Sequence, residues 1–250
     1  MKTLIAFDLD GTLAESKQAI DSEMAALLAG LTRVATVAVI SGGDWPQFEK
    51  QLVGQLPADA VRENFVVMPT TGTKLYRFQD GAWNRVYADI FSDEEKAKIL
   101  TTLQEAVTAT GLKIDQIYGE QIEDRDSQIT FSALGQQAPL AVKGPWDPDA
   151  AKRKALKAIL DPQLPDCAIN IGGASSIDIT RKGIDKGYAV GKLAEATGIP
   201  KEQMLFLGDA IFPGGNDYPV KLAGVDTVKV RDVEETKRVV EALVLSLDRG

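Results

Sequence analysis

The chain has 250 residues, a length that suits one large domain or two modest ones. Its 44% hydrophobic and 26% charged residues are ordinary for a soluble globular enzyme and exclude wholesale disorder. The net charge of −8 argues against a nucleic-acid partner, which requires a basic footprint. With no histidine and a single cysteine, Cys167, the chain cannot use Ser-His-Asp, Cys-His or zinc-histidine chemistry or form an internal disulfide. Any catalysis must therefore use carboxylates, hydroxyls, lysines and a hard metal ion.

No apolar stretch approaches the roughly 18–20 residues of a membrane span. The apolar run that precedes Asp8 holds only four residues, 4–7, and is too short for a signal peptide. We therefore expect a cytoplasmic protein with no membrane partner. The sequence leaves the oligomeric state open.

Short apolar runs alternate with helical patterns from the N-terminus onward, which is typical of a parallel sheet flanked by helices. Apolar residues at helical spacing between 20 and 31 predict a helix. Two alternating runs within 74–87, separated by Asp80-Gly81, predict a β-hairpin. The strands predicted in this part of the chain are 4–7, 34–40 and 65–68.

The pattern changes at Ser92, which forms a capping-box sequence with Glu95 and opens a predicted helix that ends at Gly111. The elements predicted after it are strands over 112–118 and 128–134, a helix over 149–160, and strands over 168–171 and 176–180. This repeated order of helix, strand and strand predicts an insert with its own sheet.

The parallel pattern resumes after Lys182, with a helix over 185–197, strands over 204–207 and 227–230, and a helix over 233–247. We therefore predict an α/β fold with a parallel-sheet core interrupted by an inserted α+β domain. The predicted boundaries are 1–86 and 184–250 for the core and 87–183 for the insert.

Two carboxylates directly follow the first predicted strand, in the sequence Asp8-Leu9-Asp10-Gly11-Thr12. Ligands of open α/β sheets bind at the carboxyl ends of the strands, so both would face a substrate. A carboxylate such as Asp8 can accept a phosphoryl group, and Asp10 can donate a proton to the leaving oxygen and later activate water. An ordinary Asp-Gly turn is the alternative. A calcium loop is disfavoured because its twelfth position is Ala19 instead of glutamate.

Ser41 and Gly42 follow the second predicted strand, where a hydroxyl and backbone N–H groups can hold phosphate oxygens. Lys186 lies at the start of a predicted helix and can neutralise a phosphoryl group there. A plain loop serine and a solvated surface lysine are the alternatives for these residues.

A further carboxylate, Asp209, follows the strand 204–207, and Asn216-Asp217 comes shortly after it. A third carboxylate at a strand end completes an oxygen cage for Mg²⁺, which binds phosphate oxygens and lets the anionic Asp8 approach an anionic phosphate. Helix capping or loop hydrogen bonding is the alternative role for Asp217.

Taken together, these segments resemble the haloacid dehalogenase (HAD) superfamily. Its motifs are DxDGT, a Ser or Thr after the second strand, a Lys, and a GD…(N)D pair, and all four are present here in order. The resemblance implies a Rossmann-like HAD core, and the long insert looks like the α+β cap of subclass IIB (C2b type).

A narrower resemblance links the chain to the eukaryotic-type phosphomannomutases of this subclass. Residues 208–217, GDAIFPGGND, are similar to their GDxxxPGGND, and residues 172–178, GGASSID, are similar to their GGxxSxD. Residues 123–125, EDR, look like their E-x-R phosphate grip. The resemblance implies that Arg125, Ser176 and Asp178 select the substrate.

The chain departs from the mutases in two places. Further cap arginines of the mutases are here Tyr118 and Gln136, and their GGSD is here Ser41-Gly42-Gly43-Asp44, in which Ser41 looks more like the phosphatases. A mutase must hold one phosphate in the cap while another is transferred in the core, so the loss of cap cations favours a phosphatase.

The resemblance thus implies a Mg²⁺-dependent phosphatase that hydrolyses small sugar phosphates, of the hexose phosphate kind, through an aspartyl-phosphate intermediate. Two alternatives stay open, an isomerase like phosphomannomutase or phosphoglucomutase and a non-catalytic sugar-phosphate sensor, the latter disfavoured because Asp8 and Asp10 are both present. The implied roles are nucleophile for Asp8, general acid/base for Asp10, phosphate binding for Ser41, Gly42 and Lys186, Mg²⁺ binding for Asp8, Asp209 and the Asp10 carbonyl, and support for Asn216 and Asp217.

Overall fold

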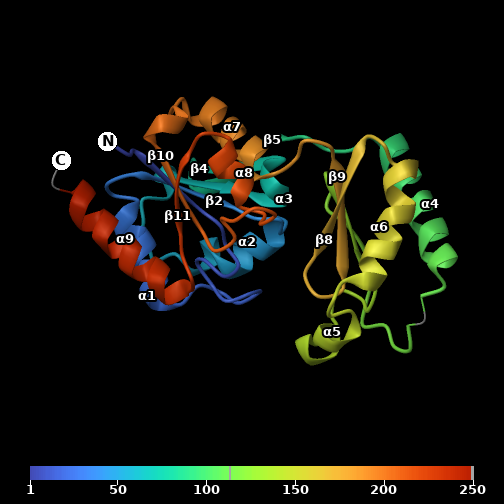
Figure 1. The fold of residues 1–250 in the computed structure, drawn as a ribbon. Coiled ribbons are helices and arrows are strands. Elements are labelled where there is room, and N and C mark those ends of the chain that lie inside the picture. The colour runs from blue at the N-terminus through green and yellow to red at the C-terminus, as the bar shows by residue number, and fades with distance from the viewer. Residues whose placement is uncertain (113, 249–250) are drawn as a thin grey trace. The chain divides into compact units, whose positions relative to one another are not determined.

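The structure, a computed structural model, describes residues 1–112 and 114–248. The chain divides into two compact units (Figure 1). The core unit comprises Met1–Ala88 and Ile184–Gly250, and the inserted unit comprises Asp89–Gly183. Among the described residues, no helix combines the length and the apolar character that a membrane span requires.

The core unit is built on a seven-stranded sheet of order β11-β10-β1-β2-β3-β4-β5. The first five strands in this order are parallel, and β4 and β5 form an antiparallel hairpin at one side. Phe7 lies opposite both Val39 and Leu207, so β1, β2 and β10 end at the same level. The strands are β1 Leu4–Phe7, β2 Thr36–Ile40, β3 Phe65–Met68, β4 Lys74–Gln79, β5 Ala82–Ala88, β10 Met204–Gly208 and β11 Asp226–Lys229.

Helices cover both faces of this sheet, which explains why β1 is entirely apolar and buried. One face packs Ile5 and Phe7 against α1 (Ser22–Leu31), α2 (Trp45–Gln51) and α9 (Val233–Leu247). The other face packs Leu4 and Ala6 against α7 (Lys186–Thr197) and α8 (Tyr218–Leu222). The short α3 (Pro69–Gly72) follows β3, and 3₁₀ turns lie at Val53–Gln55, Arg62–Asn64 and Lys201–Gln203.

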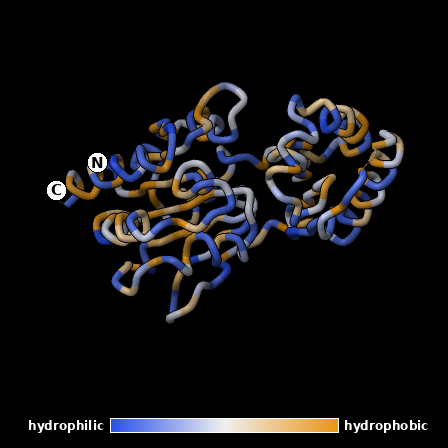
Figure 2. Tube along the Cα trace, turned by 90° about the horizontal axis from the view of Figure 1, so that it is seen from below, coloured by the Kyte–Doolittle hydropathy of each residue, from blue (hydrophilic) through white to orange (hydrophobic). Residues whose placement is uncertain are grey.

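The inserted unit has an antiparallel four-stranded sheet of order β6-β7-β9-β8. Helices α4 (Asp93–Thr110) and α6 (Ala151–Gln163) share an apolar cluster with alternate residues of β7 and β9, while the residues between them are polar. Figure 2 shows hydrophobic segments along the trace inside each unit and hydrophilic segments on its outer loops. The remaining elements are β6 Ile122–Asp124, β7 Gln128–Ser132, α5 Leu140–Trp146, β8 Cys167–Gly172 and β9 Ser176–Arg181.

The predicted α/β class with a largely parallel sheet is confirmed. The hairpin around Asp80-Gly81 is present, and Ser92 and Glu95 form the predicted capping box. The predicted strand over 112–118 is wrong: Lys113 lies outside the described residues, and residues 112 and 114–118 form no strand. The partner of β7 is β6 instead, a short edge strand whose acidic residues carry no apolar alternation. Helix α2 was not expected, because Pro46 interrupts its pattern, although proline fits the first turn of a helix.

Candidate functional site

Three predicted site residues follow strands that end at one level of the core sheet. Asp8 follows β1, Ser41 follows β2, and Asp209 follows β10. The register of these strands and the hydrogen bond from the Asp8 N–H to the Leu207 carbonyl, 3.0 Å, fix this arrangement. The candidate site therefore lies at the carboxyl end of the sheet (Figure 1).

Lys186 joins two carboxylates in the buried part of this site. Its Nζ lies 2.5 Å from Asp8 Oδ1 and 2.5 Å from Asp217 Oδ1, and all three side chains are almost fully buried. Burial raises the pKa of Asp8 to about 6, against the opposing charge of Lys186. Burial alone would lower the pKa of Lys186, but the charges of Asp8 and Asp217 outweigh it and the net pKa is raised. The lysine is thus a charged, buried partner, and the surface-lysine alternative is wrong.

Oxygens of Asp8, Asp209 and Asp217 lie within 4.8 Å of one another, a spacing that a metal ion can bridge. Burial, followed by the nearby charge of Asp217, raises the pKa of Asp209. Hard oxygen donors of this kind suit Mg²⁺. Asp217 already accepts from Lys186 with Oδ1 and from the Ala210 N–H, 3.0 Å, with Oδ2. Both oxygens of Asp217 therefore accept hydrogen bonds from the protein. Its neighbour Asn216 is exposed.

Glycines allow the carboxylates to approach the backbone closely. Gly11 has a φ of +84°, and a Cβ there would lie 2.9 Å from Asp209 Oδ2. A Cβ on Gly208 would lie 2.3 Å from Asp217 Oδ2. The loop that carries Asp10 is thus packed against Asp209, and Asp217 against the end of β10.

Asp10 is half-buried, and its Oδ1 accepts a hydrogen bond of 2.7 Å from the Lys17 backbone N–H. Lys17 adopts a positive φ of 60°, a conformation that few non-glycine residues take. The loop between β1 and α1 therefore folds back and supplies a backbone donor to this carboxylate.

The loop after β3 holds the Ser41 segment in place. The N–H of Thr71 donates to the Ser41 carbonyl, 2.9 Å, and the N–H of Thr70 donates to the Gly43 carbonyl, 2.8 Å. Both threonines have positive φ, 47° and 57°, which is strained for a β-branched residue. Gly72 packs on α7, because a Cβ there would lie 2.4 Å from the Cβ of Ala189. This turn links the Ser41 loop to the helix that begins with Lys186, and the sequence pattern gave no signal of it.

Arg125, Ser176 and Asp178 lie in the inserted unit. Ser176 and Asp178 point to the same face of β9, since the residues between and beyond them, Ile177 and Ile179, join the apolar cluster. Asp178 accepts from the Thr130 hydroxyl, 2.7 Å, and burial raises its pKa despite that bond.

Three cations of the inserted unit, Arg125, Arg153 and Lys143, contact protein acceptors. Arg125 pairs with Glu123 at 2.7 Å. Arg153 is buried, pairs with Asp147 at 2.8 Å and donates to the Gly173 carbonyl, so it holds the turn that precedes Ser176. Lys143 donates to the carbonyl of Gln136, 3.3 Å. Arg153 and Lys143 were not singled out from the sequence, where Arg153 lies in the predicted helix over 149–160 and Lys143 lies in the segment before it.

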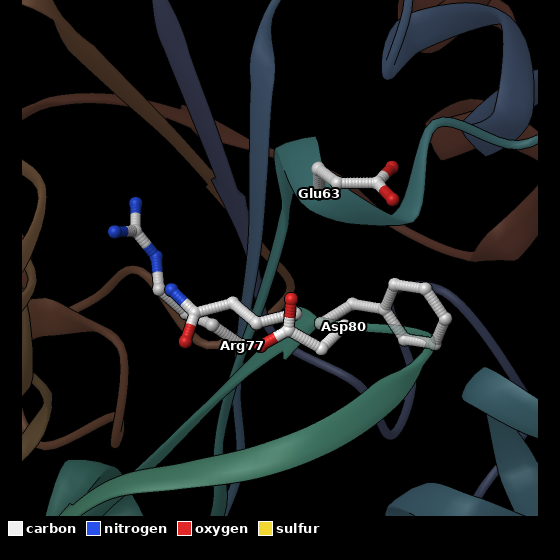
Figure 3. A pocket seen from close by; sticks show the side chains of 5 residues that line it. Glu63, Arg77 and Asp80 are labelled. Carbon is white, nitrogen blue, oxygen red and sulfur yellow. The ribbon is translucent and has the colours of Figure 1, made fainter.

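A hollow of about 570 Å³ lies elsewhere on the core unit, between Glu63 and residues 77–80 (Figure 3). Arg77 pairs with Val66, so residues 78–80 lie at the amino end of β3, opposite the end at which Ser41 and Asp8 gather. The lining includes the carboxylates Glu63 and Asp80 besides Arg77, a mixture that does not favour a phosphate.

The relatives of this chain include phosphomannomutases. The phosphomannomutase of Encephalitozoon cuniculi is 27% identical over 100% of this chain and 96% of its own length. Human phosphomannomutase 1 is 25% identical over 88% of this chain and 83% of its own length.

Solved structures share the fold. A haloacid dehalogenase-like hydrolase from Bacteroides thetaiotaomicron superposes with a TM-score of 0.67 at 16% identity, over 97% of this chain and 100% of its own. An N-terminally truncated IMP-nucleotidase from Plasmodium falciparum gives a TM-score of 0.68 at 18% identity, over 98% of this chain and 71% of its own. The sequence matches the haloacid dehalogenase-like hydrolases over residues 5–219, which span both parts of the core unit and the insert. This chain therefore belongs to the haloacid dehalogenase-like hydrolase family.

Proposed function

We propose that the chain is a Mg²⁺-dependent phosphatase that hydrolyses a hexose phosphate through an aspartyl phosphate on Asp8. The observation that carries the proposal is the buried group of Asp8, Lys186 and Asp217 beside Asp209 at the carboxyl end of the sheet. A carboxylate that is largely withdrawn from water and held beside a cation is placed to attack an electrophilic phosphorus.

The reaction requires two displacements at phosphorus. In the first, an oxygen of Asp8 forms a bond to phosphorus while the ester bond breaks and Asp10 gives a proton to the departing sugar oxygen. In the second, Asp10 takes a proton from water, the water oxygen bonds to phosphorus, and Asp8 is released. Ser41, the N–H of Gly42 and Lys186 bind the oxygens of the phosphoryl group in both steps.

The donor set fits Mg²⁺, and we propose Asp8, Asp209 and the carbonyl of Asp10 as its ligands. Bound there, the ion would neutralise charge between the carboxylates and the substrate. We propose that Asp217 supports this group, since its oxygens accept hydrogen bonds from Lys186 and from the Ala210 N–H.

The polar face of the inserted unit supports a sugar as the leaving group. Ser176 and Asp178 provide hydroxyl and carboxyl groups of the kind that bind sugar hydroxyls, and Arg125 has the planar donor set that binds a hydroxyl or phosphate. Arg153 fixes the turn before Ser176 and Asp178 through the Gly173 carbonyl. We therefore propose these three residues as the substrate-selecting group.

Isomerisation of hexose 1- and 6-phosphates is the second candidate, and the names of the relatives favour it over hydrolysis. The charge of the inserted unit favours hydrolysis, because Arg125 faces Glu123 and the positions of Tyr118 and Gln136 carry no charge. A mutase must hold a second phosphate there while it keeps water from the aspartyl phosphate. A non-catalytic sensor is disfavoured, since both Asp8 and Asp10 are in place.

One experiment tests these candidates together. Purified protein is incubated with Mg²⁺ and mannose 1-phosphate or glucose 1-phosphate, with and without a hexose bisphosphate, and both inorganic phosphate and the 6-phosphate are measured. We expect phosphate release to be faster than isomerisation, and Asp8→Asn to abolish both. Isomerisation tenfold faster than phosphate release would replace the phosphatase by the mutase, and binding of the sugar phosphate without turnover would support the sensor.

A further inference from the structure

Gln47, on α2, faces the carboxylate of Asp10. Its Nε2 lies 3.4 Å from Asp10 Oδ2 and 2.8 Å from Gln51 Oε1. A carboxylate and an amide oxygen are both acceptors, so the amide nitrogen must be the atom that faces them. We infer that Gln47 is a positioning residue that fixes the direction of the Asp10 carboxylate for proton transfer. The inference rests on the proposed function, in which Asp10 is the general acid and base.

The helix that carries Gln47 is anchored to the segment that carries Asp10. Gln51 is buried, and its backbone carbonyl accepts from the N–H of Ile20, 2.9 Å. The same β1–α1 segment supplies the Lys17 N–H to Asp10 Oδ1 at 2.7 Å. The two oxygens of Asp10 therefore face donors from two directions, the β1–α1 loop and α2.

Gly43 provides the space that Gln47 occupies. A Cβ on Gly43 would lie 2.2 Å from the side-chain oxygen of Gln47 and 2.5 Å from its amide carbon. The carbonyl of Gly43 is held by the N–H of Thr70, so the backbone cannot easily move aside. The second glycine of Ser41-Gly42-Gly43 thus lets the carboxamide lie between the Ser41 loop and Asp10.

The two contacts to Asp10 differ in length, and this difference assigns the roles of its oxygens. Oδ1 has a short, strong backbone donor, so Oδ2 is the oxygen that carries the transferable proton. When that proton passes to the departing sugar oxygen, negative charge is left on Oδ2, and the N–H of Gln47 accommodates it. Gln47 contacts neither the phosphorus nor the sugar in this scheme and acts through Asp10.

The dependence on the leaving group tests this role. A sugar alkoxide is a poor leaving group and requires the proton, whereas p-nitrophenolate leaves without one. The kcat/KM reports formation of the aspartyl phosphate, so we compare Gln47→Met and wild type on a hexose phosphate and on p-nitrophenyl phosphate with Mg²⁺. We expect a loss of roughly tenfold or more on the hexose phosphate and less than about twofold on p-nitrophenyl phosphate. Gln55→Met, at an exposed glutamine whose side-chain amide donates to the Lys50 carbonyl, is the matched control and should change neither value.

A second variant, at Gly43, tests the role of Gln47 without changing Gln47 itself. Gly43→Ala should displace the Gln47 carboxamide and produce the same leaving-group pattern, and the double variant should lose no more than the larger single loss. Crystal structures give a readout independent of turnover: in Gln47→Met the Asp10 carboxylate should leave the direction it has in the wild type.

The outcomes separate this inference from the proposed function. Asp10→Asn must itself slow the hexose phosphate more than p-nitrophenyl phosphate; if it does not, the proposed role of Asp10 is wrong. If Asp10→Asn shows that pattern while Gln47→Met slows both substrates equally, or neither, the inference about Gln47 is overturned. An unchanged Asp10 side chain in the Gln47→Met crystal structure would overturn it as well.

Discussion

Lys186 Nζ lies 2.5 Å from Oδ1 of Asp217, a carboxylate with no exposed surface. The same Nζ also contacts Asp8. One buried cation thus serves two buried carboxylates, and the group carries a net negative charge. Such a group is stable only while each charge keeps its partner, because an unpaired buried ion loses its hydration without compensation.

Replacement of this lysine should therefore affect the fold as well as activity. We expect Lys186→Met to lower the free energy of unfolding by about 3–5 kcal/mol, the range for breaking a buried ion pair, and to abolish turnover. Chemical denaturation of the metal-free protein measures the first effect. Lys192→Met, on the exposed side of the same helix, is the control and should change the unfolding free energy by less than about 0.5 kcal/mol. A loss below about 1 kcal/mol for Lys186→Met would contradict the buried pairing.

The raised pKa of Asp8 predicts how stability changes with pH. Folding moves this pKa from its ordinary value of 3.8 to about 6, so between these values the folded state binds more protons than the unfolded state. The contribution of Asp8 to stability is therefore present below about pH 4 and is lost as the pH rises through about 6, by about 3 kcal/mol at most.

Unfolding of wild type and Asp8→Asn in EDTA at pH 4 to 7 tests this. Most other titrating groups are common to both proteins, so the difference between the two unfolding free energies reports Asp8 together with the neighbouring groups coupled to it. We expect wild type to lose stability relative to Asp8→Asn as the pH rises. A difference that does not change with pH would show that Asp8 keeps an ordinary pKa.

The acidic group of Asp8, Asp209 and Asp217 predicts stabilisation by Mg²⁺. Ion binding to the folded state raises Tm by mass action. We expect Mg²⁺ to raise the Tm of wild type but not of Asp209→Asn, and EDTA to abolish turnover. Asp10→Asn should keep the Tm shift, since only its backbone carbonyl is proposed as a ligand, and should slow turnover about 10²–10⁴-fold.

Another acidic group of the core unit provides a control. Asp21, Glu23 and Glu234 surround Lys237 Nζ at 2.7–2.8 Å, so a cation of the protein already occupies their centre. Glu23→Gln should leave the Mg²⁺ shift unchanged. If the Tm shift disappeared in Glu23→Gln and persisted in Asp209→Asn, the ion would bind at the group of Glu23, and the proposed site at Asp209 would be wrong.

The candidate site at the carboxyl end of the core sheet could be predicted because its signals are local. The buried run before Asp8 and the run before Asp209 identify strands, and parallel strands bring their carboxyl ends together whatever the intervening chain does. The ion pair between Lys186 and Asp217 could not be predicted in this way, because it depends on how α7 and the loop after β10 pack in three dimensions.

Two features that the sequence did not predict, the turn at Thr70 and Thr71 and strand β6, break local rules. Threonine is a poor residue for positive φ, so the turn at Thr70 and Thr71 has no turn signature, and it is held by bonds to the Ser41 loop. β6 carries acidic residues because it is an edge strand, where charge deters pairing with other chains. Gln47 has an unremarkable sequence context, and its contact with Asp10 is visible only once α2 is placed.

The last prediction concerns Arg125 and the choice between hydrolysis and isomerisation. Its guanidinium pairs with Glu123 at 2.7 Å, and it lies close enough to Asp178 to lower the pKa of that carboxyl, although burial raises it more. It can bind a sugar hydroxyl or phosphate with two parallel N–H groups, but it is matched by one acidic partner and so has little net charge to offer a second phosphate. We therefore expect Arg125→Ala to raise KM for hexose phosphates several-fold more than KM for p-nitrophenyl phosphate, with Arg125→Lys intermediate because an ammonium lacks the planar donor pair.

Lys154→Ala, at an exposed lysine of α6, is the control and should change neither KM. Equal rises in both KM values would remove Arg125 from substrate selection. A loss of isomerisation in Arg125→Ala with phosphate release unchanged would instead assign it to a second phosphate and favour the mutase.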